Sequence, residues 1–353
     1  MKRTISIGDR RVGAGHPVYI IAELSGNHRQ SFDEAVKLVE AAKACGADAV
    51  KLQTYTADTI TIRSSAPSFS IEGGTLWDGL SLYELYQQAA TPWEWQPKLK
   101  QIANQAGMDL FSSAFDPTAV EFLEKMGVPA HKVASPELVD IPLIRQMART
   151  GKPLIISTGM AVMGEIEEAV EAARDAGAHG IALLKCCSAY PAPVSEMNLR
   201  ALSVLRERFQ CALGLSDHTM DATAAILSVG LGACIIEKHL TLSRAAGGPD
   251  AGFSLEPHEF KAMVQAVRTA EEALGSDQLG PTARESASLR FRRSLFVVKD
   301  VKKGEKFTKE NVRSIRPADG LHPRHLDRVL GRTASRDIAQ GTPLESAMVE
   351  ESE

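Results

Sequence analysis

Several features are missing from this 353-residue sequence, and each absence removes a class of protein. No apolar run is long enough to cross a bilayer, and the N-terminal MKRTISIGDRRVGAG lacks the apolar segment of a secretion signal. Lys and Arg (40) do not outnumber Asp and Glu (44), so there is no basic surplus that would favour nucleic acid. We therefore expect a cytoplasmic protein that binds neither membrane nor nucleic acid.

Cysteine is scarce, and the common nucleotide-binding motifs are absent. The odd number of cysteines lacks the spacing of a disulfide framework: Cys45, Cys186, Cys187, Cys211 and Cys234. Cys186 and Cys187 could ligate a metal, but no CxxC pair accompanies them. No GxGxxG follows the first apolar run and no GxxxxGK[ST] occurs, which argues against a dinucleotide-binding or P-loop protein.

What the sequence does contain is an alternation of short apolar runs with helix-period stretches. Eight such runs lie within the first 275 residues, at 18–23, 49–54, 109–115, 131–135, 153–159, 181–187, 212–217 and 234–240. Their uniform apolarity predicts strands buried on both faces, as in a parallel sheet. Eight βα units predict an α/β fold of the (β/α)8 TIM barrel type, with a doubly wound sheet as the alternative.

The composition of the sequence changes after the last of these units. Residues 276–290 are polar and turn-rich, as expected of a linker. Beyond them, KDVKKGEKFTKENV (299–312) and RDIAQGTPLESAMV (336–349) align as two copies of a strand–turn–helix unit. We therefore predict a catalytic barrel over 1–275 and a small β-rich accessory domain over 291–353.

Every predicted strand ends in polar or ionisable residues, and the carboxyl ends of barrel strands build the active site. A single Ser or Thr there is more often a helix N-cap than a ligand contact, but eight such ends together indicate an active site. In chain order these side chains are Glu23, Ser25, Asn27, His28, Lys51, Gln53, Ser112, Ser113, Asp116, Lys132, Ser135, Ser157, Thr158, Lys185, Ser188, Tyr190, Ser216, Asp217, His218, Glu237, Lys238 and His239.

Two lysines and two histidines carry the strongest chemical signal at these ends. Lys51 and Lys132 favour a phosphate or carboxylate site over lysines that merely extend to the surface. His218 and His239 end neighbouring strands, so both imidazoles should reach one rim. There they either hydrogen-bond in the core or bind a divalent ion such as Mn²⁺ or Mg²⁺. By strand alternation, Glu237 shares the face of His239.

Two further segments near this rim are unusual. The loop SRAAGGPDAGFS (243–254) is glycine-rich and carries Asp250, which suits either a close approach to a ligand or a plain flexible loop. Residues 54–93 form an insertion far longer than a normal βα loop. All three tryptophans (Trp77, Trp93 and Trp95), together with Tyr83 and Tyr86, lie in or beside it. This insertion is either a wall for a sugar with apolar faces or a dimer contact.

Nine motifs resemble those of the sialic-acid synthase family across nearly the full chain. They are IAELSGNH (21–28), VKLQTY (50–55), FSSAFD (111–116), HKVASPE (131–137), ISTGM (156–160), YPAP (190–193), GLSDHT (214–219), IEKHLTL (236–242) and GPDAGFSL (248–255). The C-terminal domain, with RPADG (316–320), resembles the antifreeze-like (SAF) domain of that family. GTLWDGLSLYELYQQAATPWEW (74–95) resembles its pseudaminic acid synthase branch.

The resemblance implies a synthase that condenses phosphoenolpyruvate with the open-chain aldehyde of an acylamino sugar, 6-deoxy-AltdiNAc in the pseudaminic acid branch. It implies that His218 and His239 bind the metal and that Glu23 and Asp250 handle water and protons. The residues implied for phosphoenolpyruvate are Lys51, Ser113, Lys132, Ser135, Ser157, Ser188 and Ser216. Those implied near the sugar are Asn27, Gln53, Tyr190 and Arg316, with Arg316 entering the partner subunit's site in a domain-swapped homodimer.

Departures from the family pattern leave the sugar open. Ser188 stands where many members have Asn, Lys185 to Cys187 stand where many have His-Cys, and Ala251 replaces a frequent His. The alternatives are a legionaminic acid or N-acetylneuraminic acid synthase with the same chemistry. A different class is a pyruvate-dependent aldolase, with Lys185 as the Schiff-base candidate. A third is a non-catalytic sugar- or ice-binding protein, which the polar strand ends argue against.

Overall fold

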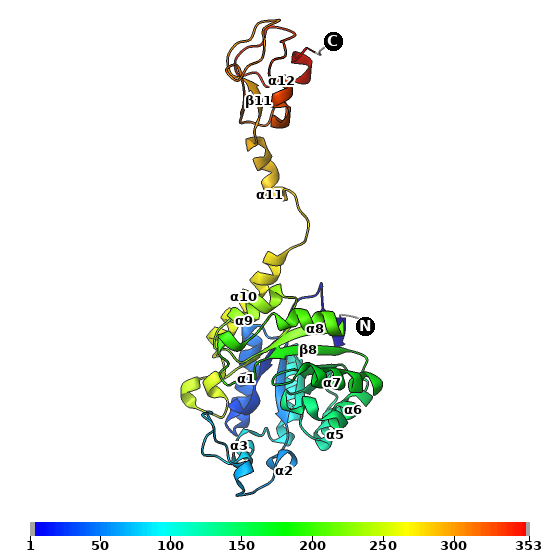
Figure 1. Cartoon of the computed structure of the whole chain (residues 1–353). Helices are drawn as coiled ribbons and strands as arrows, with labels where there is room; N and C mark the ends of the chain where they lie inside the picture. The colour runs from blue at the N-terminus through cyan, green and yellow to red at the C-terminus, as the bar shows by residue number, and fades with distance from the viewer. Residues whose placement is uncertain (1–3, 351–353) are drawn as a thin grey trace. The chain divides into compact units, whose positions relative to one another are not determined.

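The first part of the chain is a closed barrel of eight parallel strands (Figure 1). The computed structural model describes residues 4–350. The strands pair in the order β10-β3-β4-β5-β6-β7-β8-β9, so the first and last barrel strands close the cylinder. Their bounds are β3 (Tyr19–Glu23), β4 (Ala49–Thr54), β5 (Asp109–Ala114), β6 (His131–Val133), β7 (Leu154–Ser157), β8 (Ile181–Cys186), β9 (Ala212–Asp217) and β10 (Ile235–His239). The predicted TIM barrel is confirmed.

Helices cover the outside of the barrel (Figure 1). Their bounds are α1 (Phe32–Cys45), α4 (Gln96–Gln105), α5 (Pro117–Met126), α6 (Ile141–Arg149), α7 (Met163–Asp175), α8 (Ala201–Phe209), α9 (Thr223–Gly230) and α10 (Pro257–Leu274). Two short helices of the insertion after β4, α2 (Ala57–Ile60) and α3 (Leu82–Ala89), lie at one end of the barrel instead. Local chemistry sets their ends: the Ser31 hydroxyl accepts from a backbone N–H at the start of α1, and Gly46 ends it with φ of 89°. Asp116 caps α5 in the same way. Among residues 4–350, no helix is long and apolar enough to cross a membrane.

An N-terminal hairpin lies at the amino ends of the barrel strands. β1 (Thr4–Ile7) pairs antiparallel with β2 (Arg10–Gly13). A Cβ added at Gly180, directly before β8, would approach Ile5 Cγ2 to 2.9 Å, so the hairpin packs closely there. Ile5 and Ile7 are buried in the main hydrophobic core. The hairpin therefore covers one end of the barrel and leaves the carboxyl ends of the strands for a site.

Side-chain alternation along the strands decides which residues reach the barrel interior. Lys238 points outward, where its ammonium group pairs with Asp217 at 2.8 Å in the layer between strands and helices. The neighbours of Lys238 on the same strand, Glu237 and His239, therefore point into the barrel. One buried strand therefore accommodates an acid, a base and an imidazole side by side, because the base lies on the opposite face from the other two.

From Ser276 onward the chain forms a second compact unit. Its elements are α11 (Ala283–Ser286), η8 (Ala287–Phe291), β11 (Ser294–Val297), β12 (Val312–Ile315), η9 (Pro323–His325), α12 (Leu326–Val329) and η10 (Ser346–Met348). Val301 and Ile338, which occupy equivalent positions of the two sequence repeats, donate backbone hydrogen bonds to each other at 2.9 and 2.8 Å. Phe307 and Leu344, another equivalent pair, lie in the small core of this unit. The repeats thus pack as a pseudo-symmetric pair.

Candidate active site

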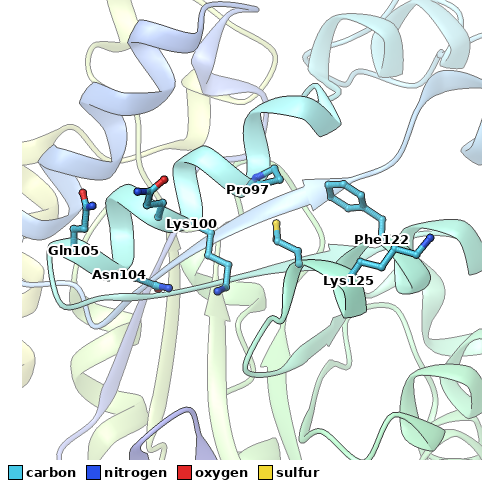
Figure 2. Close-up of a pocket in the computed structure, with 8 residues that line it drawn as sticks. Pro97, Lys100, Asn104, Gln105, Phe122 and Lys125 are labelled. Atoms are coloured by element: carbon cyan, nitrogen blue, oxygen red, sulfur yellow. The ribbon is translucent and has the colours of Figure 1, made fainter.

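A cavity of about 400 Å³ lies at the carboxyl ends of the barrel strands. It is lined by Lys51, Gln53, Tyr55, Ile60, Trp77, Leu85, Tyr86, Ala89, Phe115, Lys132, Ala134, Ser135, Pro136, Glu137, Ser157, Cys186, Tyr190, Ser216, His218, Glu237, His239, Asp250 and Phe253. A groove of about 750 Å³ between α4 and α5 is larger, but its lining comes from the outer faces of those helices, with Lys100, Phe122 and Lys125 (Figure 2). The strand-end cavity is therefore the candidate active site.

A lysine between two carboxylates forms the floor of the cavity. Lys51 Nζ lies 2.7 Å from Glu23 Oε2 and 3.5 Å from Glu237 Oε1, and it donates to Ser113 Oγ at 3.1 Å. Gln53 Nε2 donates to the other oxygen of Glu23 at 3.0 Å. These groups converge because β10, β3 and β4 are neighbours in the closed barrel.

The two carboxyl groups of this floor respond differently to burial. Burial raises the pKa of Glu23 to about 7, an effect that Lys51 offsets only in part. Burial acts in the same direction on Glu237, but the positive charges around it, chiefly Lys51 and Lys132, outweigh it and lower its pKa. One carboxylate thus stays ionised while the other exchanges a proton near neutral pH, a pattern suited to acid–base chemistry.

A second lysine and several hydroxyls border a space that suits an anion. Lys132 Nζ donates to Ser157 Oγ at 2.7 Å, and burial lowers the pKa of this lysine to about 8. The ammonium group is therefore charged at neutral pH. The Gly159 N–H donates to Ser135 Oγ at 3.2 Å, and a Cβ at residue 159 would collide with Ser188 Oγ. The missing side chain at Gly159 therefore lets the Ser135 and Ser188 hydroxyls pack directly against the backbone.

His218 and His239 face each other at the rim, with ring centroids 5.2 Å apart. The Nδ1–H of His218 donates to the Cys187 carbonyl at 2.8 Å, which leaves Nε2 as the nitrogen available to a ligand. Burial alone would lower the pKa of His218, but Cys186 and the Cys187 carbonyl outweigh burial and raise it. Burial lowers the pKa of His239 well below its usual value, so that ring is neutral. His239 Nδ1 is buried without a hydrogen-bond partner in the part of the chain that the structure describes.

These two imidazoles suit a divalent cation without forming a complete ligand set. Within residues 4–350, no group of three or more His, Cys, Asp or Glu side chains is arranged to hold a metal. Two neutral nitrogens would leave the other positions to water and substrate oxygens, as catalytic metal sites do. The buried His239 nitrogen without a partner is the observation that favours such an ion.

The loop after β10 brings Asp250 to the cavity. The Ser25 hydroxyl donates to Asp250 Oδ2, and burial raises the pKa of this carboxyl group. Asn27 lies behind the cavity lining, because its amide donates to the Leu240 carbonyl at 2.9 Å and to Ser254 Oγ at 2.8 Å. In this structure Asn27 therefore braces the Asp250 loop.

Four other predicted site residues also lie outside the lining. Glu23 is fully buried behind Lys51, which Ser113 also contacts. Ser188 Oγ lies 3.7 Å from Cys186 Sγ. Arg316 belongs to the second unit, where it lines a separate hollow.

Three ionisable side chains line the cavity although no motif gave them a role. Cys186 Sγ lies 3.9 Å from His218 Nδ1, and Glu237 lies on the floor beside Lys51. Strand alternation was the signal available for both, because it places them on inward faces. Glu137 has a buried oxygen without a hydrogen-bond partner among the described residues, and burial raises its pKa to about 7. It lies in a 3-10 turn (Pro136–Val139), for which strand periodicity gives no direction.

Comparison with known proteins adds three findings. A pseudaminic acid synthase from Campylobacter jejuni subsp. jejuni serotype O:23/36 (strain 81-176) is 44% identical over 94% of this chain and 96% of its own length. An N,N'-diacetyllegionaminic acid synthase from Legionella pneumophila subsp. pneumophila (strain Philadelphia 1) is 34% identical over 94% of each chain. The crystal structure of an N-acetylneuraminic acid synthetase from Leptospira borgpetersenii serovar Hardjo-bovis superposes with a TM-score of 0.73 at 29% identity. That match covers 83% of this chain and 97% of the Leptospira chain.

The family matches extend over both units of the chain. Residues 38–279 match the NeuB family, and residues 292–350 match the SAF domain. The first match spans most of the barrel, and the second spans the pseudo-symmetric unit that follows it. This chain therefore belongs to the NeuB family of sialic acid synthases and carries a SAF domain at its C-terminal end.

Proposed function

We propose that this protein condenses phosphoenolpyruvate with the open-chain aldehyde of 6-deoxy-AltdiNAc, the reaction of a pseudaminic acid synthase. The observation that carries the proposal is a single cavity in which two lysines, a row of hydroxyls and two facing imidazoles meet at the strand ends. Identity of 44% to a pseudaminic acid synthase over 94% of this chain supports the choice of sugar.

The reaction forms one carbon–carbon bond and breaks one carbon–oxygen bond. C3 of phosphoenolpyruvate attacks the aldehyde carbon, whose oxygen takes up a proton and becomes an alcohol. Water adds to the cationic C2 and loses a proton. The resulting hemiketal phosphate then expels phosphate with cleavage of the C2–O bond, which leaves a C2 ketone in the nine-carbon acid.

We assign the lysines and hydroxyls to the anionic donor. Lys132, Ser135 and Ser157 line the cavity, where phosphate oxygens would accept charge-assisted hydrogen bonds from them. Lys51 would serve the carboxylate end of the donor. The remaining hydroxyls assigned to phosphoenolpyruvate are those of Ser113, Ser188 and Ser216.

We assign His218 and His239 to a divalent metal, with Mn²⁺ or Mg²⁺ as the expected ion. When bound, such an ion polarises the aldehyde oxygen as a Lewis acid. The protein orients His218 through the Cys187 carbonyl and keeps His239 neutral through burial. Tyr190, whose ring centroid lies 4.5 Å from that of His218, would contact the sugar together with Gln53.

Glu23 and Asp250 would move the protons. The water that adds to C2 must lose a proton, and a carboxylate whose pKa lies near 7 is well matched to accept it. Glu23 has such a pKa and lies directly behind Lys51, which lines the cavity. Asp250, which lines the cavity and accepts a hydrogen bond from Ser25, would supply the proton that the new alcohol requires.

Phosphate release with different sugars tests the proposal. The purified protein, phosphoenolpyruvate and a divalent metal are combined with 6-deoxy-AltdiNAc, its legionaminic acid counterpart or N-acetylmannosamine. We expect the highest kcat/KM with 6-deoxy-AltdiNAc. Equal turnover of N-acetylmannosamine would contradict this sugar and favour the runner-up, a legionaminic or N-acetylneuraminic acid synthase.

An aldolase that forms a Schiff base with pyruvate is disfavoured by the direction of Lys185. Cys186 lines the cavity, so by alternation along β8 its neighbour Lys185 faces away from it. Lys185 Nζ instead donates to the Cys186 carbonyl at 2.5 Å. Borohydride with pyruvate should therefore leave the protein unmodified at Lys185, and a covalent adduct there would support the aldolase.

We also propose a homodimer in which Arg316 of each chain completes the partner subunit's site. Mixing His239→Ala protomers with Arg316→Ala protomers tests this arrangement. If Arg316 acts across the dimer, half of the sites in a mixed dimer contain both intact residues, and activity returns on mixing. If Arg316 acts within its own chain, every site keeps one defect and no activity returns.

A further inference from the structure

One half of the cavity carries no charge. Its surface consists of the side chains of Tyr55, Ile60, Leu85, Tyr86, Ala89 and Phe115. Tyr55 contacts both Tyr86 and Phe115 edge-on, with ring centroids 5.6 and 5.0 Å apart. We call this surface the apolar wall. All of its members except Phe115 come from the insertion, residues 54–93, whose role the sequence left open between a sugar wall and a dimer contact.

Hydrogen bonds attach the insertion to the rim of the barrel. The indole N–H of Trp77 donates to the Pro249 carbonyl at 2.7 Å, directly before Asp250. At the end of α3, Gln30 Nε2 donates to the carbonyls of Gln88 and Ala90 at 2.9 and 2.7 Å. The insertion is thereby tied on one side to the catalytic loop and on the other to the turn after β3.

Close packing also fixes the distance of α3 from the site. A Cβ added at Gly26 would lie 3.1 Å from the Cα of Ala89 and 3.3 Å from Pro249 Cγ. These contacts would be tighter than most real Cβ contacts, so a side chain at residue 26 would require α3 or Pro249 to shift. The helix therefore presents Leu85 and Ala89 to the cavity at a fixed depth.

The apolar wall is covered within a single chain. Leu85 is 9% exposed and Ala89 is 6% exposed. Side chains that are already turned into a cavity are not available to a second copy of the chain. The burial of both residues therefore favours a ligand-facing role over a dimer contact.

We propose that Ile60, Leu85 and Ala89 determine sugar specificity by packing against apolar substituents, a deoxy-carbon methyl or an acetamido methyl, at the end of the sugar far from the aldehyde. This inference rests on the proposed function. A hydroxyl group at that position would lose its hydrogen bonds to water on binding and would gain no hydrogen-bond partner from these three side chains. Rejection of an added hydroxyl by an apolar pocket amounts to roughly 10²-fold.

The test compares two sugars in one assay. Sugar-dependent phosphate release gives kcat/KM for 6-deoxy-AltdiNAc and for N-acetylmannosamine, whose terminal carbon carries a hydroxyl group. We expect the wild-type ratio of the two values to fall roughly tenfold in Leu85→Asn, with KM for phosphoenolpyruvate unchanged. Leu85→Met, which keeps the apolar volume, should retain the ratio.

Leu82→Asn is the matched control, because Leu82 lies on the same helix but does not line the cavity. Its ratio should equal that of the wild type. If Leu85→Asn fails to fold, Ile60→Thr provides the same comparison at a half-buried position. An unchanged ratio in the folded variant would overturn the inference alone. Absence of any sugar-dependent phosphate release by the wild-type chain would overturn the proposed function as well.

Discussion

The two halves of the cavity consist of different kinds of side chain, and different parts of the chain contribute them. The strand-end half consists of charged and hydroxyl-bearing side chains that the barrel topology brings together, such as Lys51, Lys132 and Glu237. The other half is the apolar wall, contributed mainly by a single insertion after β4. We infer that the first half performs the chemistry common to the family and the second selects the sugar.

This difference carries a physical consequence for mutations. In the strand-end half, Lys51 is paired with Glu23 and Glu237, so removing one of these charges leaves its partner uncompensated in a low-dielectric site. The apolar wall stabilises its ligand by contact and water exclusion, which change by smaller steps. Changes in the strand-end half should therefore abolish or reshape catalysis, whereas changes in the insertion should adjust it.

The largest effect is expected at the rim imidazoles. His218→Ala or His239→Ala removes one of two proposed metal ligands, and we expect kcat to fall by more than about 10³-fold. Circular dichroism should show an intact barrel in both variants. A near-normal rate in either variant would refute the metal role. It would also contradict the inference that the strand-end half performs the chemistry.

The next effect concerns Glu23, the carboxyl group behind Lys51. Glu23→Gln should lower kcat by about 10²-fold while KM changes little, because general base catalysis acts in the transition state. The raised pKa of Glu23, about 7, means that its carboxylate forms as the pH rises through 7. Wild-type kcat should therefore increase across that range, and the increase should vanish in the variant.

Glu137→Gln is the control for this pH profile. Burial raises the pKa of Glu137 to about 7 as well, so the profile alone does not identify the group. If Glu137→Gln abolishes the increase in kcat and Glu23→Gln keeps it, the base has been assigned to the wrong carboxyl group.

A smaller effect is expected from the second lysine. The pKa of Lys132 is lowered to about 8, so its ammonium group is charged below that pH and loses its proton above it. We expect KM for phosphoenolpyruvate to rise about tenfold for each pH unit above 8. Lys132→Arg, which stays charged, should remove this rise even if its affinity is lower throughout. A KM independent of pH in the wild type would contradict an anion-binding role.

The smallest effect is expected where the insertion meets the catalytic loop. Trp77→Phe keeps a ring beside Tyr190 and Phe253 but loses the hydrogen bond to the Pro249 carbonyl. Loss of one hydrogen bond of about 1 kcal/mol predicts a roughly fivefold fall in kcat/KM for the sugar. Steady-state kinetics should show KM for phosphoenolpyruvate unchanged. A loss as large as that of the histidine variants would mean that the insertion takes part in the chemistry.

The barrel and much of the strand-end half could be predicted from the sequence because both follow from periodicity. Uniformly apolar runs identify buried parallel strands, and alternation along β10 places Glu237 with His239 on the inward face. Closure of the barrel then brings residues as distant as Glu23 and Glu237 to the same lysine.

The remaining features of the site depend on the paths of the loops, which the periodicity of the sequence does not predict. In the sequence, Asn27 follows shortly after a strand. Its side-chain amide nevertheless donates to the Leu240 carbonyl and braces the Asp250 loop. Glu137 faces the cavity only because a 3-10 turn follows β6. Long-range contacts of Gly26 and Trp77 determine which side of the insertion faces the cavity. A local sequence pattern does not predict such contacts.

The most direct test of the account follows the bridging oxygen of phosphoenolpyruvate. The donor is labelled with ¹⁸O between C2 and phosphorus, and the released phosphate is analysed by mass spectrometry with and without 6-deoxy-AltdiNAc. We predict labelled phosphate that forms only when the sugar is present, together with one solvent oxygen at C2 of the product. Unlabelled phosphate, or release that proceeds without the sugar, would contradict condensation at this site.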